Sequence, residues 1–65
     1  MNLDLKKVFL IMARNCISDK DMLEKANLSF GTWQQIKTGK CKAKLATIGK
    51  IAKGLSVDVT EIIEQ

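Results

Sequence analysis

The sequence predicts a small all-α domain built from five short helices. Apolar residues recur at spacings of three and four along most of the chain, which is the period of an amphipathic helix. Ser, Asn and Asp residues stand where helix caps are needed, and no proline or strand-like alternation interrupts the pattern. With 65 residues, of which 46% are apolar, the chain is expected to form one domain, residues 1–65, of modest stability.

The first helix is expected over residues 3–15, with Asn2 as its N-cap. Its apolar stripe comprises Leu5, Val8, Phe9, Met12 and Cys16. The second helix is expected to begin after Ser18, because a capping serine followed by Asp21 in the first turn is a favourable N-terminus. Met22, Leu23 and Ala26 supply its apolar face. Asn27 is expected to end it, because asparagine tolerates the left-handed conformation.

The third helix is predicted between the capping residue Ser29 and the helix-stopping Gly39. Trp33 and Ile36 lie three residues apart and are expected to face inward, with Trp33 in the core rather than stacking on bases. Only Leu28 separates Asn27 from Ser29, so the second and third helices are expected to meet at a sharp angle.

The fourth helix is expected over residues 44–54. Its apolar stripe comprises Leu45, Ile48, Ile51, Ala52 and Leu55. Gly49 and Gly54 weaken this helix by about 0.5–1 kcal/mol each and are expected to permit close packing. A fifth helix is predicted over residues 58–64, capped by Asp58 and Glu61. Ile62 faces the core, and Val59 and Ile63 lie either at the core margin or in a dimer interface.

Charge is distributed unevenly along the chain. The net charge is +4, and residues 25–57 contain seven lysines and no Asp or Glu. Unopposed lysines beside a short helix bearing amide and hydroxyl side chains suit a polyanion, because lysines neutralise phosphates and glutamines read base edges. The alternative is an ordinary solvated surface. This segment therefore predicts binding to double-stranded DNA.

The residues give little indication of disulfides, metal sites or catalysis. The chain has no His, and two cysteines, Cys16 and Cys41, make neither a disulfide framework nor a zinc site, so reduced thiols are expected. No nucleophile with a nearby base, glycine-rich phosphate loop or carboxylate pair indicates an enzyme. We expect no cofactor, no metal, no membrane segment and no small-molecule effector. A cytoplasmic, nucleoid-associated protein is expected.

The second helix, the tight turn and the third helix together have the pattern of a helix-turn-helix, at about residues 18–38, with the recognition helix at about 29–38. Over residues 18–40 and 45–59 the chain resembles the small repressor and Cro-like regulators of phages and mobile elements, the Xre-type group. The resemblance implies a five-helix, lambda-repressor-like domain that places the third helix in the major groove. It also implies a homodimer on a two-fold operator, with Val59 and Ile63 at its interface.

The resemblance also assigns candidate contacts by position. Those to bases are Phe30, Thr32, Gln34 and Gln35, and those to phosphates are Lys20, Ser29, Lys37, Lys40, Lys42 and Lys44. Gln35 is the strongest candidate, because its amide can pair bidentately with adenine N6 and N7. Phe30 suits a thymine methyl group, although a packing or dimer contact is an alternative for it. Gln34 and Gln35 are otherwise ordinary helix surface.

Several residues depart from the family pattern. The turn carries Asn27 where glycine is usual, and Leu23 stands where a small alanine is common. At the position of Asp19, relatives often have a polar residue that holds a DNA phosphate, which the negative charge of Asp19 would repel. Many relatives pair an arginine in the first helix with a glutamate late in the third, and Met12 and Lys37 stand there instead.

The sequence therefore predicts a DNA-binding transcriptional regulator, a repressor or Cro-like protein of a phage or mobile element. Two alternatives remain. One is a protein-binding antirepressor or adaptor that uses the helix-turn-helix as a scaffold, favoured by Asp19 and Gly31, which weaken the expected DNA contacts. The other is a DNA-binding accessory factor in excision of the element.

Overall fold

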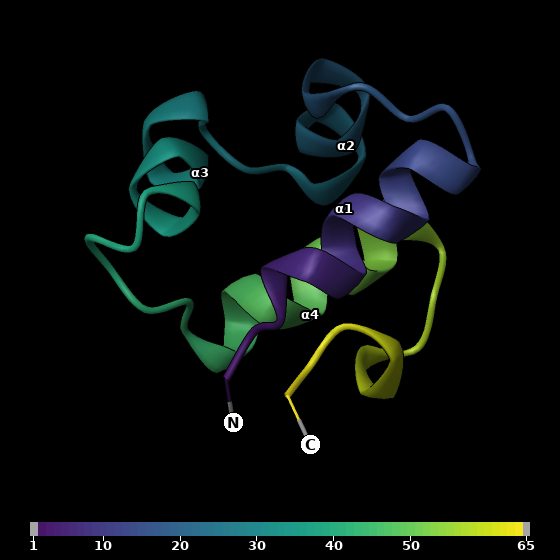
Figure 1. Cartoon of the computed structure of the whole chain (residues 1–65). Helices are drawn as coiled ribbons and strands as arrows, with labels where there is room; N and C mark the ends of the chain where they lie inside the picture. Colours follow the sequence, from purple (N-terminus) through teal and green to yellow (C-terminus); the bar gives the residue numbers. More distant parts are fainter. Residues whose placement is uncertain (1, 65) are drawn as a thin grey trace.

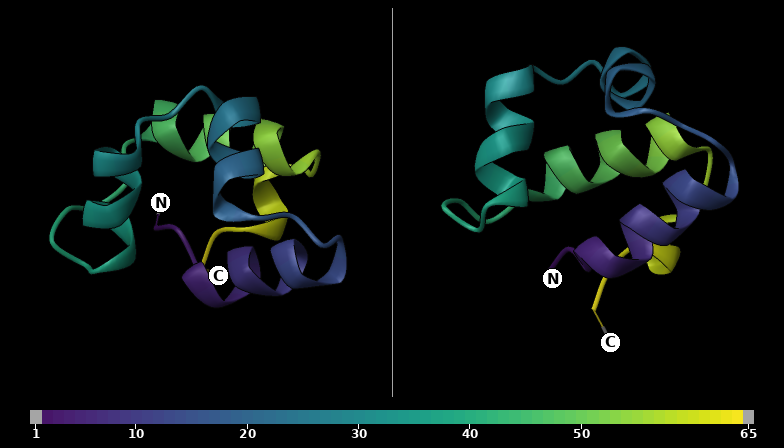
Figure 2. Two further views of the ribbon diagram at one scale, coloured as in Figure 1. Left: turned by 90° about the horizontal axis from the view of Figure 1, so that it is seen from above. Right: turned by 45° about the horizontal axis from the view of Figure 1, so that its top comes forward.

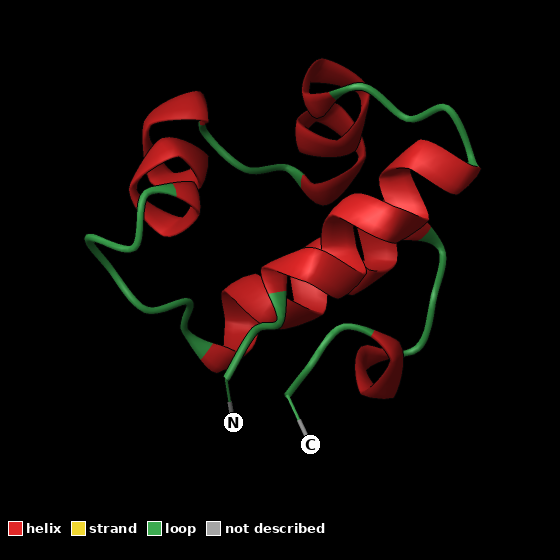
Figure 3. Cartoon of the chain, in the orientation of Figure 1, coloured by secondary structure: helices red, strands yellow, loops and turns green. Residues whose placement is uncertain are grey.

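The computed structural model describes residues 2–64, and these form an all-helical globule (Figures 1 and 3). In chain order its elements are α1 (Leu5–Arg14), α2 (Asp19–Ala26), α3 (Phe30–Lys37), α4 (Leu45–Leu55) and the 3-10 helix η1 (Val59–Glu61). No strand occurs among these residues, so the predicted all-α class is confirmed. The fifth predicted helix is reduced to the single turn η1. No helix within residues 2–64 has the length and apolar character needed to cross a membrane.

The predicted caps of α2 and α3 are confirmed. The Ser18 hydroxyl accepts a hydrogen bond from Asp21 N at 3.1 Å, and the Ser29 hydroxyl accepts one from Thr32 N at 3.2 Å. Asn27 ends α2 in the left-handed conformation, with φ of 57°. These hydrogen bonds satisfy amides that have no partner within the helix, so the local sequence sets where both helices begin.

The ends of the other two α-helices differ from the prediction by one or two residues. α1 starts at Leu5 because Asp4, not Asn2, caps it and accepts a hydrogen bond from Lys7 N at 3.3 Å. α4 continues through Leu55 and ends at Ser56, which adopts the left-handed conformation with φ of 59°.

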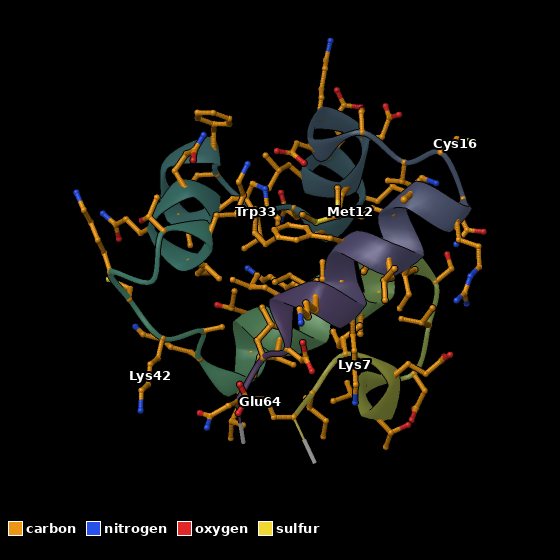
Figure 4. All side chains as sticks on the ribbon, in the orientation of Figure 1. Lys7, Met12, Cys16, Trp33, Lys42 and Glu64 are labelled. Carbon is orange, nitrogen blue, oxygen red and sulfur yellow. The ribbon has the colours of Figure 1, made fainter. Side chains whose placement is uncertain are left out.

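Trp33 lies at the centre of the core, where it is fully buried (Figure 4). The ring of Phe9 meets it edge-on, with centroids 6.4 Å apart and planes inclined by 80°. The other buried apolar residues are Val8, Ile11, Met12, Met22, Leu23, Ala26, Ile36, Ile48, Ile51, Ala52, Leu55 and Ile62. The predicted core positions of Trp33, Ile36 and Ile62 are therefore confirmed, and each of the four α-helices contributes to one core.

Three predicted core positions are wrong. Phe9 is 43% exposed, Leu45 is 69% exposed, and Cys16 is also on the surface. Leu45 is the first residue of α4 and Cys16 follows the end of α1 with φ of 54°, so neither lies where a helical stripe meets the core. Ile11, which the predicted stripe omitted, is buried instead.

α4 packs closely against α2 at Gly54. A Cβ atom at Gly54 would lie 3.0 Å from Ala26 Cβ and 3.0 Å from the carbonyl oxygen of Met22. At Gly49, by contrast, a Cβ would meet nothing within 4 Å. The predicted packing role is therefore confirmed for Gly54 alone, and the missing side chain allows α2 to sit against α4.

The two glycines of α4 are expected to respond oppositely to alanine. Gly49→Ala should raise the free energy of unfolding by about 0.5–1 kcal/mol, because alanine restricts the unfolded chain and favours the helix. Gly54→Ala should lower it by about 1 kcal/mol, because overpacking against α2 costs about 1–3 kcal/mol and outweighs the helix propensity gained. Urea unfolding of both variants measures this difference, and equal shifts would contradict the packing role of Gly54.

The two ends of the described chain pair with each other. Asp4 N donates to Ile62 O at 2.8 Å, and Glu64 N donates to Asn2 O at 2.8 Å. These bonds flank an antiparallel bridge between Leu3 and Ile63. The ammonium of Lys7 also donates to Ile63 O at 3.0 Å. Ile63 is therefore half-buried against the core margin.

η1 joins this pairing to α4. Asp58 and Glu61 form the predicted capping box, and a hydrogen bond from the hydroxyl of Thr60 is the largest cause that lowers the pKa of the Asp58 carboxyl. Val59 is half-buried and packs against the core margin.

Candidate nucleic-acid interface

α3 is presented at one side of the molecule by the turn at Asn27. The left-handed conformation of Asn27 ends α2 and turns the chain toward α3, and Leu28 N donates to Leu23 O at 3.1 Å across the turn. Figure 2 shows α2 nearly end-on in a view that shows α3 from the side, which agrees with the predicted sharp angle. The buried pair Trp33 and Ile36 holds the inner face of α3, so its opposite face is exposed.

A groove of about 550 Å³ runs between this exposed face, the loop 38–44 and the start of α4. It is lined by Asn27, Leu28, Ser29, Thr32, Gln35, Ile36, Cys41, Lys42, Ala43, Lys44, Thr47 and Lys50. Three lysines and no acidic residue are among them. The groove therefore combines a positive electrostatic potential with the hydrogen-bonding groups of α3.

The lysines of the groove come from two segments. Lys42 and Lys44 lie in the loop, where Lys42 extends away from the body of the molecule (Figure 4), and Lys50 lies in α4. Lys44 is also the N-cap of α4, and its side chain makes no capping hydrogen bond. The first turn of α4 carries no acid, so its free amides add to the positive potential of the three ammonium groups.

Gln35 joins α3 to the loop. Its carbonyl oxygen accepts hydrogen bonds from Lys40 N at 3.0 Å and Cys41 N at 3.3 Å. Its side-chain oxygen Oε1 accepts one from the thiol of Cys41, with Sγ 3.3 Å away. Gly39, with φ of 79°, allows the chain to turn back onto α3. The loop that carries Lys42 and Lys44 is thus anchored on the strongest candidate for base contact.

Ser29 and Thr32 line the groove at the start of α3. The Ser29 hydroxyl donates to Thr32 Oγ1 at 2.8 Å while accepting from Thr32 N. Both side chains are exposed, but their hydroxyls already bind each other. Ser29 therefore defines the start of α3 in addition to lining the groove.

Lys37 lies outside the groove and pairs with Asp19. Lys37 Nζ is 2.9 Å from Asp19 Oδ2, and the ammonium lies 5.9 Å from the ring centroid of Trp33. The hydrogen bond from Lys37 is the largest cause that lowers the pKa of Asp19, and partial burial opposes it. The buried Trp33 indole N–H has no acceptor within hydrogen-bonding distance among residues 2–64, so the lowering of this pKa is attributed to Lys37. The negative charge of Asp19 is thus compensated within the protein.

The ion pair makes stability depend on pH. Because the pKa of Asp19 is lowered in the folded state, the pair stabilises the fold above the pKa of an unfolded aspartate, about 4, and this contribution is lost as the pH falls through the folded pKa. Both side chains are partly exposed, so solvent screening limits the contribution to about 0–1 kcal/mol. Urea unfolding should show Asp19→Asn less stable than the unmodified protein at pH 7 and equal to it at pH 2. A difference that persists at pH 2 would contradict this assignment.

A second hollow, of about 720 Å³, lies between α2 and the start of α3. It is lined by Asp19, Lys20, Leu23, Glu24, Asn27, Leu28 and Phe30. Phe30 is 60% exposed, and it lines this hollow together with the apolar residues Leu23 and Leu28. The predicted contacts Phe30 and Lys20 therefore line a hollow with mixed charge, which borders the lysine groove at Asn27 and Leu28.

The structure brings together five of the predicted contacts. These are Ser29, Thr32, Gln35, Lys42 and Lys44. Gln34, Lys37 and Lys40 do not line the groove. The prediction omitted Thr47 and Lys50 of α4, which line it. Their spacing was a usable signal, because Lys44, Thr47 and Lys50 follow one another at intervals of three and so share a helix face.

No protein-family model, curated protein or solved structure matches this chain. Evidence for function therefore comes from the geometry and charge of the surface. Among residues 2–64, no three side chains of His, Cys, Asp or Glu gather as a metal site.

Proposed function

We propose that this protein is a sequence-specific double-stranded DNA-binding regulator, a repressor or Cro-like protein of a phage or mobile element. The observation that carries the proposal is the acid-free groove in which Gln35 and Thr32 of α3 lie beside Lys42, Lys44 and Lys50. Amide and hydroxyl groups on a helix suit base edges, and the surrounding lysines suit phosphates. The hollows beside α2, beside the paired chain ends and beside the end of α1 each include an acidic residue.

We further propose that α2, the turn at Asn27 and α3 act as a helix-turn-helix within a lambda-repressor-like domain. The left-handed turn, the buried Trp33 and the exposed outer face of α3 support this assignment. In this mechanism α3 enters the major groove, and the loop and the start of α4 lie along the phosphate backbone.

Repression then follows because the bound protein occupies DNA that polymerase needs. We propose a homodimer in which two copies of α3 enter successive major grooves about 34 Å apart and exclude polymerase. Val59 and Ile63 are the proposed dimer contacts, and both are half-buried and leave apolar surface uncovered. Sedimentation of the free protein tests the dimer, and a reporter assay on the native promoter distinguishes repression from a role in excision.

The test of DNA binding is selection of binders from a randomised duplex library at ~150 mM salt. Recovery of a two-fold symmetric motif would support a dimeric regulator. No enrichment by the folded protein would count against sequence recognition, and no binding to random duplex at lower salt would count against DNA altogether.

Two variants separate base contacts from phosphate contacts. Gln35→Ala is expected to cost about 1–3 kcal/mol on the selected sequence and to relax preference at one base pair, because a base-edge contact is lost. Lys42→Ala is expected to weaken selected and random duplexes equally, because phosphates carry no sequence information. Fluorescence anisotropy on both duplexes measures the two effects, and identical profiles for the two variants would contradict this division of roles.

A second candidate function is that of a protein-binding adaptor. The observation that favours it is the hollow in which the exposed ring of Phe30 lies beside Leu23 and Leu28. An exposed aromatic residue beside an apolar hollow is typical of a protein contact. If this were the main function, Phe30→Ala would abolish regulation in the reporter assay while DNA affinity stayed unchanged.

A further inference from the structure

Cys41 and Gln35 contact each other through both main chain and side chain, although they lie six positions apart in the sequence. Cys41 N donates to the main-chain oxygen of Gln35, and the Cys41 thiol donates to the side-chain oxygen Oε1, each at 3.3 Å. Both residues are exposed and both line the lysine groove. The thiol therefore contacts the functional end of the side chain proposed to read a base.

This contact determines which end of the Gln35 amide is turned to the loop. A glutamine amide has an acceptor at its oxygen and two donors at its nitrogen, and the two ends exchange places when the amide rotates by half a turn. The thiol is a donor, so it favours the orientation that brings Oε1 to Cys41. Among residues 2–64, nothing accepts a hydrogen bond from Nε2, so both of its donors are available.

Donors and acceptors select different bases in the major groove. Bidentate pairing with adenine needs both Oε1, which accepts from N6, and Nε2, which donates to N7. Guanine presents two acceptors there, O6 and N7, and needs donors only. Because Oε1 already accepts from the thiol, one of its two lone pairs remains for adenine N6, whereas both donors of Nε2 remain for guanine. The contact therefore makes Gln35 a poorer match for adenine, relative to guanine, than a free glutamine.

We propose that Cys41 is a positioning residue that holds Gln35 as a hydrogen-bond donor and thereby biases base selection from adenine toward guanine. This inference rests on the proposed function, because it concerns how the same site chooses its sequence. Cys41 itself contacts no base in this mechanism. Its effect is confined to the base pair that Gln35 reads, while the lysines supply affinity for any duplex.

The test uses four duplexes that differ only at the base pair where Gln35→Ala loses preference. The unmodified protein is expected to prefer guanine to adenine there. Cys41→Ala should shift this ratio toward adenine by about two- to tenfold, the range for loss of one hydrogen bond. Cys41→Ser should keep the ratio, because its hydroxyl also donates. Cys16→Ser is the matched control, because it removes the other exposed thiol at a site outside the groove.

A measurement on the free protein separates this inference from DNA binding itself. In NMR spectra, the Gln35 side-chain amide should lose order in Cys41→Ala and retain it in Cys41→Ser. Affinity for random duplex should be equal in all three proteins, because the lysines are unchanged. If affinity for random duplex is high and the base ratio is the same in Cys41→Ala as in the unmodified protein, the inference is overturned while the proposed function stands. Preference of the unmodified protein for adenine also overturns it.

Discussion

Raising the salt concentration from about 50 to about 200 mM is expected to weaken binding to a duplex by about 10³–10⁵-fold. The reason is the release of counterions from phosphates that the lysines neutralise, at a slope of about −0.9 per phosphate in a plot of log K against log salt. Lys40, Lys42, Lys44 and Lys50 lie in or beside the groove and lack any described ion-pair partner. Four contacts per copy predict a slope near −7 for a dimer.

Titrations of one duplex at several salt concentrations measure this slope. Lys42→Ala should reduce its magnitude by about two for a dimer, because one phosphate contact is lost in each copy. Lys6→Ala is the matched control, because Lys6 is an exposed lysine of α1 outside the groove, and it should leave the slope unchanged. A slope shallower than about −2 in the unmodified protein would contradict the lysine groove as the main source of affinity.

Trp33→Ala is expected to leave the protein largely unfolded at 25 °C. Replacing a fully buried tryptophan by alanine costs about 3–5 kcal/mol, through lost transfer free energy and the cavity that remains. A single core of this size supplies about 3–5 kcal/mol of stability. The substitution therefore removes about as much stability as the fold has, and the ordered position of α3 is lost with it.

Thermal unfolding followed by far-ultraviolet circular dichroism measures this effect. Phe30→Ala is the matched control, because it also removes an aromatic side chain from α3, but one that is 60% exposed. This control should change the free energy of unfolding by no more than about 0.5 kcal/mol. A cooperative transition for Trp33→Ala within a few degrees of the unmodified protein would contradict the central role of Trp33.

The features that the sequence predicted well are set by short-range interactions. Ser18, Asn27 and Ser29 define α2, the turn and the start of α3 because each acts on the backbone within four residues of itself. Trp33 was recognised as core because its inner position follows from helical spacing with Ile36. These predictions needed no knowledge of how the helices pack.

The features that the sequence did not predict depend on contacts between distant segments. Leu45 belongs to an apolar stripe, but it extends past the edge of the core and is exposed. Lys37 was assigned to phosphate, yet its partner is Asp19, eighteen residues earlier. The thiol contact of Cys41 on Gln35 depends on the path of the loop 38–44, which no spacing rule describes.

Part of the lysine groove could also have been found by a wider reading of the sequence. Most of the predicted contacts came from the third helix and the loop after it, and none came from within α4, although Lys50 shares a face with Lys44. Conversely, the acid-free segment contains all three lysines of the groove, although Lys37 of the same segment pairs with Asp19. The charge distribution therefore indicated all three lysines of the groove, whereas similarity by position indicated Lys42 and Lys44 and omitted Lys50.

The pairing of residues 2–4 with residues 62–64 has a consequence for how the molecule folds. It closes a loop of almost the whole chain, so its entropic cost is the largest of any contact in the structure. The helices can form first from nearby residues, and this pairing is expected to be made after the rate-limiting barrier. Changes at Leu3 or Ile63 should therefore accelerate unfolding and leave the folding rate nearly constant. The pairing of the two ends therefore determines the lifetime of the folded state and not the rate at which that state forms.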